Sequence, residues 1–485
     1  MERSNAWKKY TPEEKQKVFS FAEDYRQFIS DCKTERTCVD RISAEAKAAG
    51  FIRLEDVIAS GKRLMPGDRV YTDRMGKSLV LFVIGKRPLE KGLRILGAHI
   101  DSPRLDIKQN PLYEDTQMVL LDTHYYGGIK KYQWVALPLA LHGVVAKKDG
   151  SVVKVAIGDR ADDPVLGVSD LLIHLAADQM EKKLAKGVEG EKLDVLIGSM
   201  PATDPAGPGQ TAQTDAAAFE EASAKNPKEA KDSVRENILR ILKEQYGIEE
   251  EDFLSAELEV VPAGPARDYG LDRSMIMGYG HDDRVCAYPS FTAIRDVQTP
   301  EYTSACLLVD KEEIGSVGAT GMQSRFFENT VAELCAAAGD YSELTVRRCL
   351  MRSKALSSDV SAAYDPNYPE VMEKKNAAYF GRGVVFNKYT GSRGKSGSND
   401  ASAEYMAKIR RIMDDAGVNF QTAELGKVDQ GGGGTIAYIL GNYGMRVIDS
   451  GVAVLNMHAP WEIISKADLY EAKCCYEAFL ADTAE

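Results

Sequence analysis

Apolar residues near the start of the chain recur at the spacing of one helix face. They stand at Val18, Phe19, Ala22 and Tyr25, an interval typical of an amphipathic helix. Thr11 has the side chain of an N-cap and Pro12 suits the first helical position, so we expect this helix to begin at Pro12. A last helix is expected over 466–480.

Short apolar runs predict buried strands at 78–84, 93–99, 304–309 and 446–455, the last of them broken by Gly451. Two of these runs lead directly into polar residues, because His99 ends one and Asp310 follows another. Ligand sites in open α/β sheets usually lie at the carboxyl ends of strands. The pattern therefore predicts an α/β fold with candidate chemistry at one edge of its central sheet.

A region with a different hydrophobic pattern interrupts the predicted α/β arrangement. From about residue 108 the chain has short alternating segments with Gly turns, and Lys148-Asp149-Gly150 is a hairpin signal. The stretch 202–228 has almost no large apolar residue and is expected to be a mobile loop. We therefore expect an α/β domain formed by 1–107 and 263–485, interrupted by a β-rich domain at 108–262.

Charge and composition narrow the function. The 61 Lys and Arg against 73 Asp and Glu give a net charge of −12, which argues against nucleic-acid and anionic-membrane partners. No apolar run reaches the roughly 20 residues of a membrane helix. The polar amino terminus and eight scattered cysteines suggest a cytoplasmic protein with reduced thiols.

Histidines and acidic pairs follow several apolar runs. His99 and Asp101 share one face of an extended segment, and a metal-bound histidine commonly needs such a carboxylate to orient it. His458 is the second candidate. Acidic residues cluster at Asp282-Asp283, Glu312-Glu313 and Asp359. Each cluster alone could be a solvated turn, but adjacent carboxylates at strand ends are costly unless a cation or proton lies between them.

Two histidines with four or five carboxylates are the ligand inventory of a two-metal site, and imidazole with carboxylate suits zinc. The motifs also match a known family in order. They are GAHIDSP at 97–103, HDDR at 281–284, EEIGS at 312–316, SDV at 358–360, GGTI at 433–436 and MH at 457–458. On these motifs the chain resembles the family of aspartyl aminopeptidase and vacuolar aminopeptidase I, which are di-zinc metallo-aminopeptidases.

The resemblance implies a site and its cofactors. The implied metal ligands are His99, Asp282, Glu313, Asp359 and His458. Asp282 would bridge two Zn²⁺ ions per subunit, for which Co²⁺ or Mn²⁺ are possible substitutes, and its bond to Asp283 would be cis. Glu312 would be the general base acting on a metal-bridged water, and Asp101 would hold His99.

The resemblance also implies an architecture: a catalytic α/β domain with a central mixed sheet, an inserted dimerisation domain, and a dodecamer built from dimers. His174 matches a histidine that reaches into the neighbouring subunit's active site. Lys388 lies near a substrate-binding lysine, with the register open. Asp365 stands where aspartyl-selective members carry a histidine. A carboxylate there would repel acidic substrate residues and attract basic ones.

The Gly run around Gly433 lacks the Lys-Ser/Thr ending of a phosphate loop. Two interpretations of the run therefore remain. Its backbone could closely approach a bound peptide, or the run could be a plain flexible turn. The interpretation is a zinc aminopeptidase acting on peptides with neutral or basic amino-terminal residues. The alternatives are an aspartyl-selective enzyme of the same family, a non-catalytic assembly protein on this scaffold, and a metal-free glycosidase with a carboxylate pair.

Overall fold

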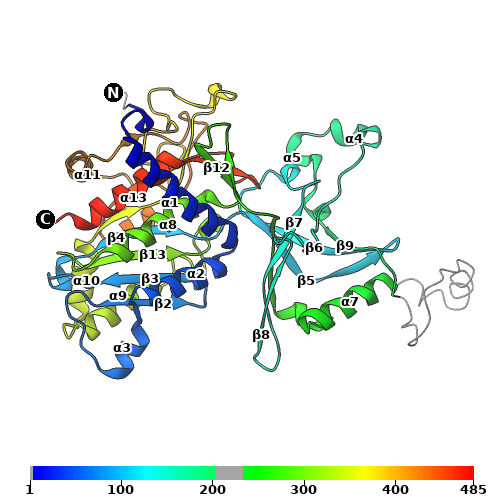
Figure 1. Cartoon of the computed structure of the whole chain (residues 1–485), viewed down its shortest axis with the longest axis horizontal. Coiled ribbons are helices and arrows are strands. Elements are labelled where there is room, and N and C mark those ends of the chain that lie inside the picture. The colour runs from blue at the N-terminus through cyan, green and yellow to red at the C-terminus, as the bar shows by residue number, and fades with distance from the viewer. Residues whose placement is uncertain (1–3, 203–232, 485) are drawn as a thin grey trace, which may run out of the picture. The chain divides into compact units, whose positions relative to one another are not determined.

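The computed structural model describes residues 4–202 and 233–484 (Figure 1). The loop expected at 202–228 lies outside the described residues except for Ala202. The chain divides into two units, one from the segments up to Ser102 and from Pro265 onward, the other from Pro103 to Gly264. The first division comes earlier than the expected boundary at 107/108, because Arg104–Asp115 forms one continuous strand.

The first unit contains a nine-stranded mixed sheet. In spatial order its strands are β1 (Ile52–Arg53), β2 (Arg69–Arg74), β3 (Ser78–Val83), β13 (Ser304–Val309), β4 (Arg94–His99), β14 (Lys354–Ser357), β18 (Arg446–Gly451), β16 (Val384–Asn387) and β17 (Phe420–Thr422). The four central strands β13, β4, β14 and β18 run parallel to one another. The mixed α/β class predicted from the sequence is confirmed.

Alternation along the strands gives the sheet two apolar faces. Leu79 and Leu81 pack into one core and Val80 and Phe82 into the other. One face packs against α1 (Pro12–Asp31), α2 (Glu35–Ala48), α8 (His281–Asp296), α11 (Ala403–Ala416) and α13 (Lys466–Ala481). The other packs against α3 (Leu54–Ser60), α9 (Phe326–Ala337), α10 (Glu343–Arg352) and α12 (Ala437–Gly441). This double cover buries β13, β4 and β14 along their whole length and leaves only Arg446 of β18 exposed.

The predicted start of the first helix is confirmed. The Thr11 side chain accepts the Glu14 N–H at 3.2 Å, and the Glu14 side chain accepts the Thr11 N–H at 2.7 Å. This reciprocal capping box satisfies two backbone donors that the helix itself leaves unpaired.

A five-stranded sheet completes the first unit. Its order is β11 (Arg267–Tyr269), β12 (Met275–Gly278), β20 (Glu462–Ser465), β19 (Ala453–Leu455) and β15 (Ser361–Ala362). The run predicted at 446–455 with a break at Gly451 forms two strands, because the chain changes sheets between Gly451 and Ala453.

The second unit is built on a six-stranded antiparallel sheet. Its order is β8 (Val152–Ile157), β7 (Leu139–Ala146), β10 (Ala256–Pro262), β5 (Arg104–Asp115), β6 (Met118–Tyr126) and β9 (Val195–Gly198), with helices α4 (Ala177–Met180), α5 (Leu184–Gly187) and α7 (Ser233–Tyr246). The predicted hairpin joins β7 to β8. In the described part of the chain, every helix is too short or too polar to span a bilayer.

Candidate metal centre

Three neighbouring strands bring candidate ligands to one edge of the nine-stranded sheet. His99 is the last residue of β4, Glu312 and Glu313 follow β13, and Asp359 follows β14. Because β13 and β14 both pair with β4 in parallel, their carboxyl ends meet at the same edge. Residues far apart in the sequence therefore converge where the apolar runs predicted them.

Two further candidates come from the five-stranded sheet. Asp282 lies at the start of α8, just after β12, and His458 lies in the turn between β19 and β20. Antiparallel pairing of Gly278 with Glu462 holds β12 and β20 together. His458 has a positive φ of 64°, so its side chain is carried by a tight left-handed turn.

Asp282 occupies the centre of this group. Its Oδ1 lies 3.0 Å from His99 Nε2, and its Oδ2 lies 3.3 Å from His458 Nε2. Glu313 Oε1 lies 3.7 Å from the same His458 nitrogen. Ligand atoms also lie within 4.8 Å of one another in three sets: His99 with Asp282 and Glu313, His99 with Glu312 and Asp359, and Asp282 with Asp283 and Asp359.

These residues fit zinc. Asp282 Oδ1 and Glu313 Oε1 are buried and accept no hydrogen bond from the described residues, and such orphaned oxygens are costly unless something binds them. Nitrogen and oxygen ligands of a tetrahedral zinc with bonds of about 2.0–2.1 Å lie about 3.3 Å apart, close to the two Asp282–histidine distances. The donor set therefore matches the cation predicted from the sequence.

The electrostatics of the metal-free site favour protonated carboxyls. Burial, with the nearby Asp282 charge, raises the pKa of Glu313 well above its usual value, and burial with Glu312 does the same for Asp359. Burial also raises the pKa of Glu312 to about 7. Bound cations would replace these protons.

Asp282 behaves in the opposite way. Burial acts to raise its pKa, but contacts with His458 and His99 outweigh burial and lower it below the usual value. Burial likewise opposes the charging of His99, while Asp101 and Asp282 raise the pKa of that imidazole. Without a cation, Asp282 is thus the ionised carboxylate between two histidines.

Asp101 links His99 to the acidic turn. Its Oδ1 lies 3.3 Å from His99 Nδ1, and its two oxygens accept the backbone N–H groups of Glu312 at 3.1 Å and Glu313 at 3.2 Å. The sequence placed Asp101 beside His99 but did not predict this hold on the turn. One buried carboxylate therefore positions three candidate residues.

Glu462 has a matching place on the other side of the centre, and the sequence analysis assigned it no role. It accepts the Asp282 N–H at 3.0 Å and the His458 N–H at 2.8 Å, and only 1% of it is exposed. Burial raises its pKa to about 8. A carboxylate at the start of a buried, apolar strand such as β20 is unusual. That position was the feature of the sequence that could have marked Glu462 as a functional residue.

The Asp282–Asp283 peptide bond is cis, as the family resemblance implied. Asp283 itself is fully buried, and its Oδ2 accepts the His99 N–H at 3.4 Å. Asp283 thus contacts the backbone of a candidate ligand.

Two residues that the sequence analysis assigned to substrate binding, Lys388 and Asp365, contact residues other than the candidate metal ligands. Lys388 forms an ion pair with Asp400, which also binds Lys395 at 3.0 Å. Asp365 accepts the Asn367 N–H at 2.8 Å and so closes a local turn. The visible contacts of both residues are local, and their substrate roles stay predictions.

The glycine run is constrained beside Gly433 rather than at it. A Cβ added at Gly431 would lie 1.7 Å from the Leu425 carbonyl oxygen, and Gly432 has φ +117°, whereas a Cβ at Gly433 would make an ordinary contact of 3.6 Å. The Gly433 N–H donates to the Thr390 carbonyl at 3.1 Å.

His174 belongs to the second unit and lies in an exposed 3₁₀ turn, Ile173–Leu175. The other ten predicted site residues lie in the first unit. That His174 acts in the active site of a neighbouring subunit stays a prediction.

Comparison with known proteins identifies the family. Residues 28–480 match the family model described as aminopeptidase I zinc metalloprotease (M18). A probable M18 family aminopeptidase 1 of Clostridium acetobutylicum is 60% identical over 479 residues, which cover 99% of this chain and 98% of the relative.

Solved structures agree. The crystal structure of aminopeptidase I from Clostridium acetobutylicum superposes with a TM-score of 0.88 at 56% identity, covering 99% of this chain and 100% of that one. The mApe1 dodecamer of S. cerevisiae shares the fold with a TM-score of 0.73 at 20% identity, covering 95% of this chain and 96% of its own. The chain therefore belongs to the M18 family of zinc metallo-aminopeptidases.

Proposed function

We propose that this enzyme removes single amino-terminal residues from peptides with two Zn²⁺ ions per subunit. His99, Asp282 and Asp359 would hold one ion, and Asp282, Glu313 and His458 the other. Bound zinc would polarise the scissile carbonyl and lower the pKa of a water molecule. The observation that carries the proposal is Asp282, whose two carboxylate oxygens each face a different histidine.

Glu312 is the proposed general base. Its carboxyl group lies beside His99 and Asp359, and burial raises its pKa to about 7, near the range in which a group can both accept and return a proton. It would take the proton of the attacking water and deliver it to the leaving amine. Asp101 supports this role by fixing the Glu312 backbone.

Replacing Glu312 tests the assignment. Glu312→Gln keeps the size of the side chain but cannot accept the proton, so turnover is expected to fall by about 10²–10⁴-fold. Zinc content, measured by elemental analysis, is expected to stay at the wild-type level. Wild-type turnover in this variant would contradict the role, and loss of zinc would make Glu312 a ligand instead.

The preferred substrates would carry neutral or basic amino-terminal residues. Asp365 follows the Asp359 segment where aspartyl-selective relatives of this family carry a histidine. Aminoacyl-nitroanilides of Lys, Leu, Asp and Glu test the preference, with Asp365→Asn as the matched variant. Faster cleavage of Asp or Glu than of Lys and Leu would refute it and favour the aspartyl-selective alternative.

We further propose a homo-oligomer, a dodecamer built from dimers through the second unit, acting in the cytoplasm. The fold shared with the S. cerevisiae mApe1 dodecamer supports the assembly, and eight free cysteines support a reducing compartment.

If His174 acts in a neighbouring subunit, then mixing inactive His174→Ala chains with inactive Glu312→Gln chains restores activity. Mixtures that assemble but stay inactive would contradict that action.

A further inference from the structure

A cavity of about 380 Å³ lies at the amino-terminal edge of the nine-stranded sheet, and every charged residue in its lining is a cation. Lys91, Arg352, Lys354 and Arg446 all contribute to its wall, with Tyr302 beside them. The edge is opposite the metal centre, because β4, β14 and β18 begin here, and β4 and β14 lead to His99 and Asp359 at their other ends.

The register of the strands concentrates the charge. Arg94, Lys354 and Arg446 are the first residues of β4, β14 and β18, and Lys354 pairs in register with both arginines. Residues in register on neighbouring strands point to the same face, about 4.8 Å apart. Like charges in that arrangement repel each other, so the fold stands to gain from an anion here.

The neighbouring groups neutralise only part of this charge. Lys408, on α11, pairs with Asp482 at 3.1 Å. Arg94 stacks on Tyr302 with its guanidinium 3.8 Å from the ring centre, and donates to the Ala484 carbonyl at 3.0 Å. Within the part of the chain that the structure describes, both arrangements leave Lys354 without a counter-charge.

Lys354, one of the three aligned cations, has no acidic partner for its positive charge in the described residues. It is only 7% exposed, and no carboxylate in residues 4–202 or 233–484 forms an ion pair with it. Burial, with Arg94 and Lys408 nearby, lowers its pKa to about 7. An ammonium on so largely buried a side chain is disfavoured without a counter-charge.

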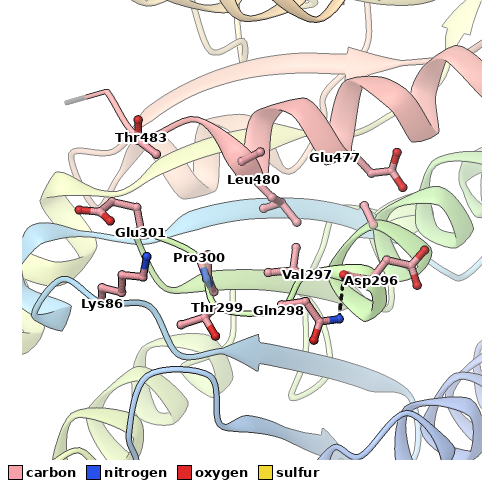
Figure 2. A pocket seen from close by; sticks show the side chains of 12 residues that line it. Lys86, Asp296, Val297, Gln298, Thr299, Pro300, Glu301, Glu477, Leu480 and Thr483 are labelled. Carbon is pink, nitrogen blue, oxygen red and sulfur yellow. Dashed lines mark hydrogen bonds between the residues drawn. The ribbon is translucent and has the colours of Figure 1, made fainter.

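A second cavity at this edge shows that the positive charge is local. It has about 470 Å³ and lies beside the segment that leads into β13 (Figure 2). Its charged lining residues are Lys86, Asp296, Glu301 and Glu477, so acidic groups predominate. An anion would be excluded from that cavity and drawn to the one at Lys354.

We propose that the cavity at Lys354 is a binding site for a small multivalent oxyanion, with the chemistry of phosphate or a polycarboxylate. Lys354 provides the buried charge, and the guanidinium groups of Arg446 and Arg352 at the cavity wall are suited to paired hydrogen bonds with oxyanion oxygens. The site is separate from the metal centre and requires no substrate peptide.

Calorimetry with inorganic phosphate on the zinc-loaded full chain tests the site. Lys354→Met is expected to weaken phosphate binding at least about tenfold, the loss of a charged hydrogen bond. Lys354→Arg should retain most of it, and Lys86→Met in the acidic cavity should leave it unchanged. Citrate in place of phosphate distinguishes the two oxyanion sources.

Folding and competing sites are controlled in the same experiment. Lys354→Met removes an unpaired buried charge, so in phosphate-free buffer it should melt no lower than wild type and keep wild-type activity. Phosphate bound at the metal centre would persist in Lys354→Met and inhibit turnover.

Two results would overturn the proposal. One is equal phosphate binding by wild type and Lys354→Met. The other is a changed oligomeric state in Lys354→Met with no phosphate binding by wild type, which would assign the cavity to a contact between subunits.

Discussion

The two edges of the nine-stranded sheet carry opposite charge on the same strands. β4 begins at Arg94 and ends at His99, while β14 begins at Lys354 and leads to Asp359. The carboxyl-terminal edge gathers carboxylates around the buried Asp282, and the amino-terminal edge gathers cations around the buried Lys354.

The comparison teaches how a buried excess of one charge indicates a ligand. At the carboxyl-terminal edge, burial raises the pKa of Glu313 and Asp359, and at the other edge burial lowers the pKa of Lys354. Both shifts reduce the charge of the site when no ion is bound. A cation would restore the charged forms at the first edge and an anion at the second.

The largest expected effect comes from Asp282. Asp282→Ala removes the carboxylate shared by both proposed zinc sites, so turnover should fall to background and zinc content should drop below wild type. Steady-state kinetics and elemental analysis on the same preparation measure both. A fully loaded, active Asp282→Ala enzyme would remove the basis for a shared ligand.

A smaller effect is expected at Glu462. Glu462→Gln weakens its hold on the backbone of Asp282 and His458, so zinc affinity should fall by about 10–100-fold, as for other residues that orient metal ligands. Competition with a chromophoric chelator measures the affinity.

Asp468→Asn is the matched control for Glu462→Gln. Asp468 is also buried and accepts two backbone N–H groups, from Gly381 at 2.8 Å and Gly383 at 2.7 Å, but it contacts no candidate ligand through them. Its zinc affinity should stay at the wild-type value. Equal losses in both variants would mean that any buried carboxylate matters, not the position of Glu462.

Metal removal should change how stability depends on pH. In the metal-free chain the folded-state pKa values of Glu313 and Asp359 lie above their unfolded values, so their stabilising protonation is complete at low pH and is lost as pH rises through the folded values. The melting temperature of the zinc-free enzyme should therefore fall from about pH 5 to pH 8 relative to the zinc-loaded form. A gap that stays constant or narrows with rising pH would contradict this.

The smallest effect is expected at the opposite edge and has the opposite sign. The folded-state pKa of Lys354 is lowered to about 7, below its unfolded value, so the folded state binds fewer protons and stability rises as pH increases from about 7 to 10. Lys354→Met should lose this increment, measured by chemical denaturation in phosphate-free buffer. Parallel curves for wild type and variant would contradict the burial of an uncompensated charge.

Much of the metal centre can be predicted from the sequence, because the ends of buried strands can be recognised where apolar runs stop. His99, Glu312, Glu313 and Asp359 each follow an apolar run, and parallel pairing then brings those ends together. The sequence also singled out His458 and the Asp282-Asp283 pair, and the family motifs then implied that Asp282 and His458 are ligands. Their meeting depends on a second sheet that periodicity did not reveal.

The residues that were missed depend on pairing between distant strands. Glu462 begins a strand and matters only because that strand lies beside Gly278. Arg94, Lys354 and Arg446 are ordinary basic residues until the register aligns them. The first division between the two units also differs from the expected boundary at 107/108, since β5 begins at Arg104.

Anomalous diffraction at the zinc edge from crystals of the zinc-loaded enzyme tests the central claim most directly. The account predicts two peaks per chain, one between His99 and Asp282 Oδ1 and one between His458 and Asp282 Oδ2. A single peak, or two peaks that do not share Asp282, would contradict it.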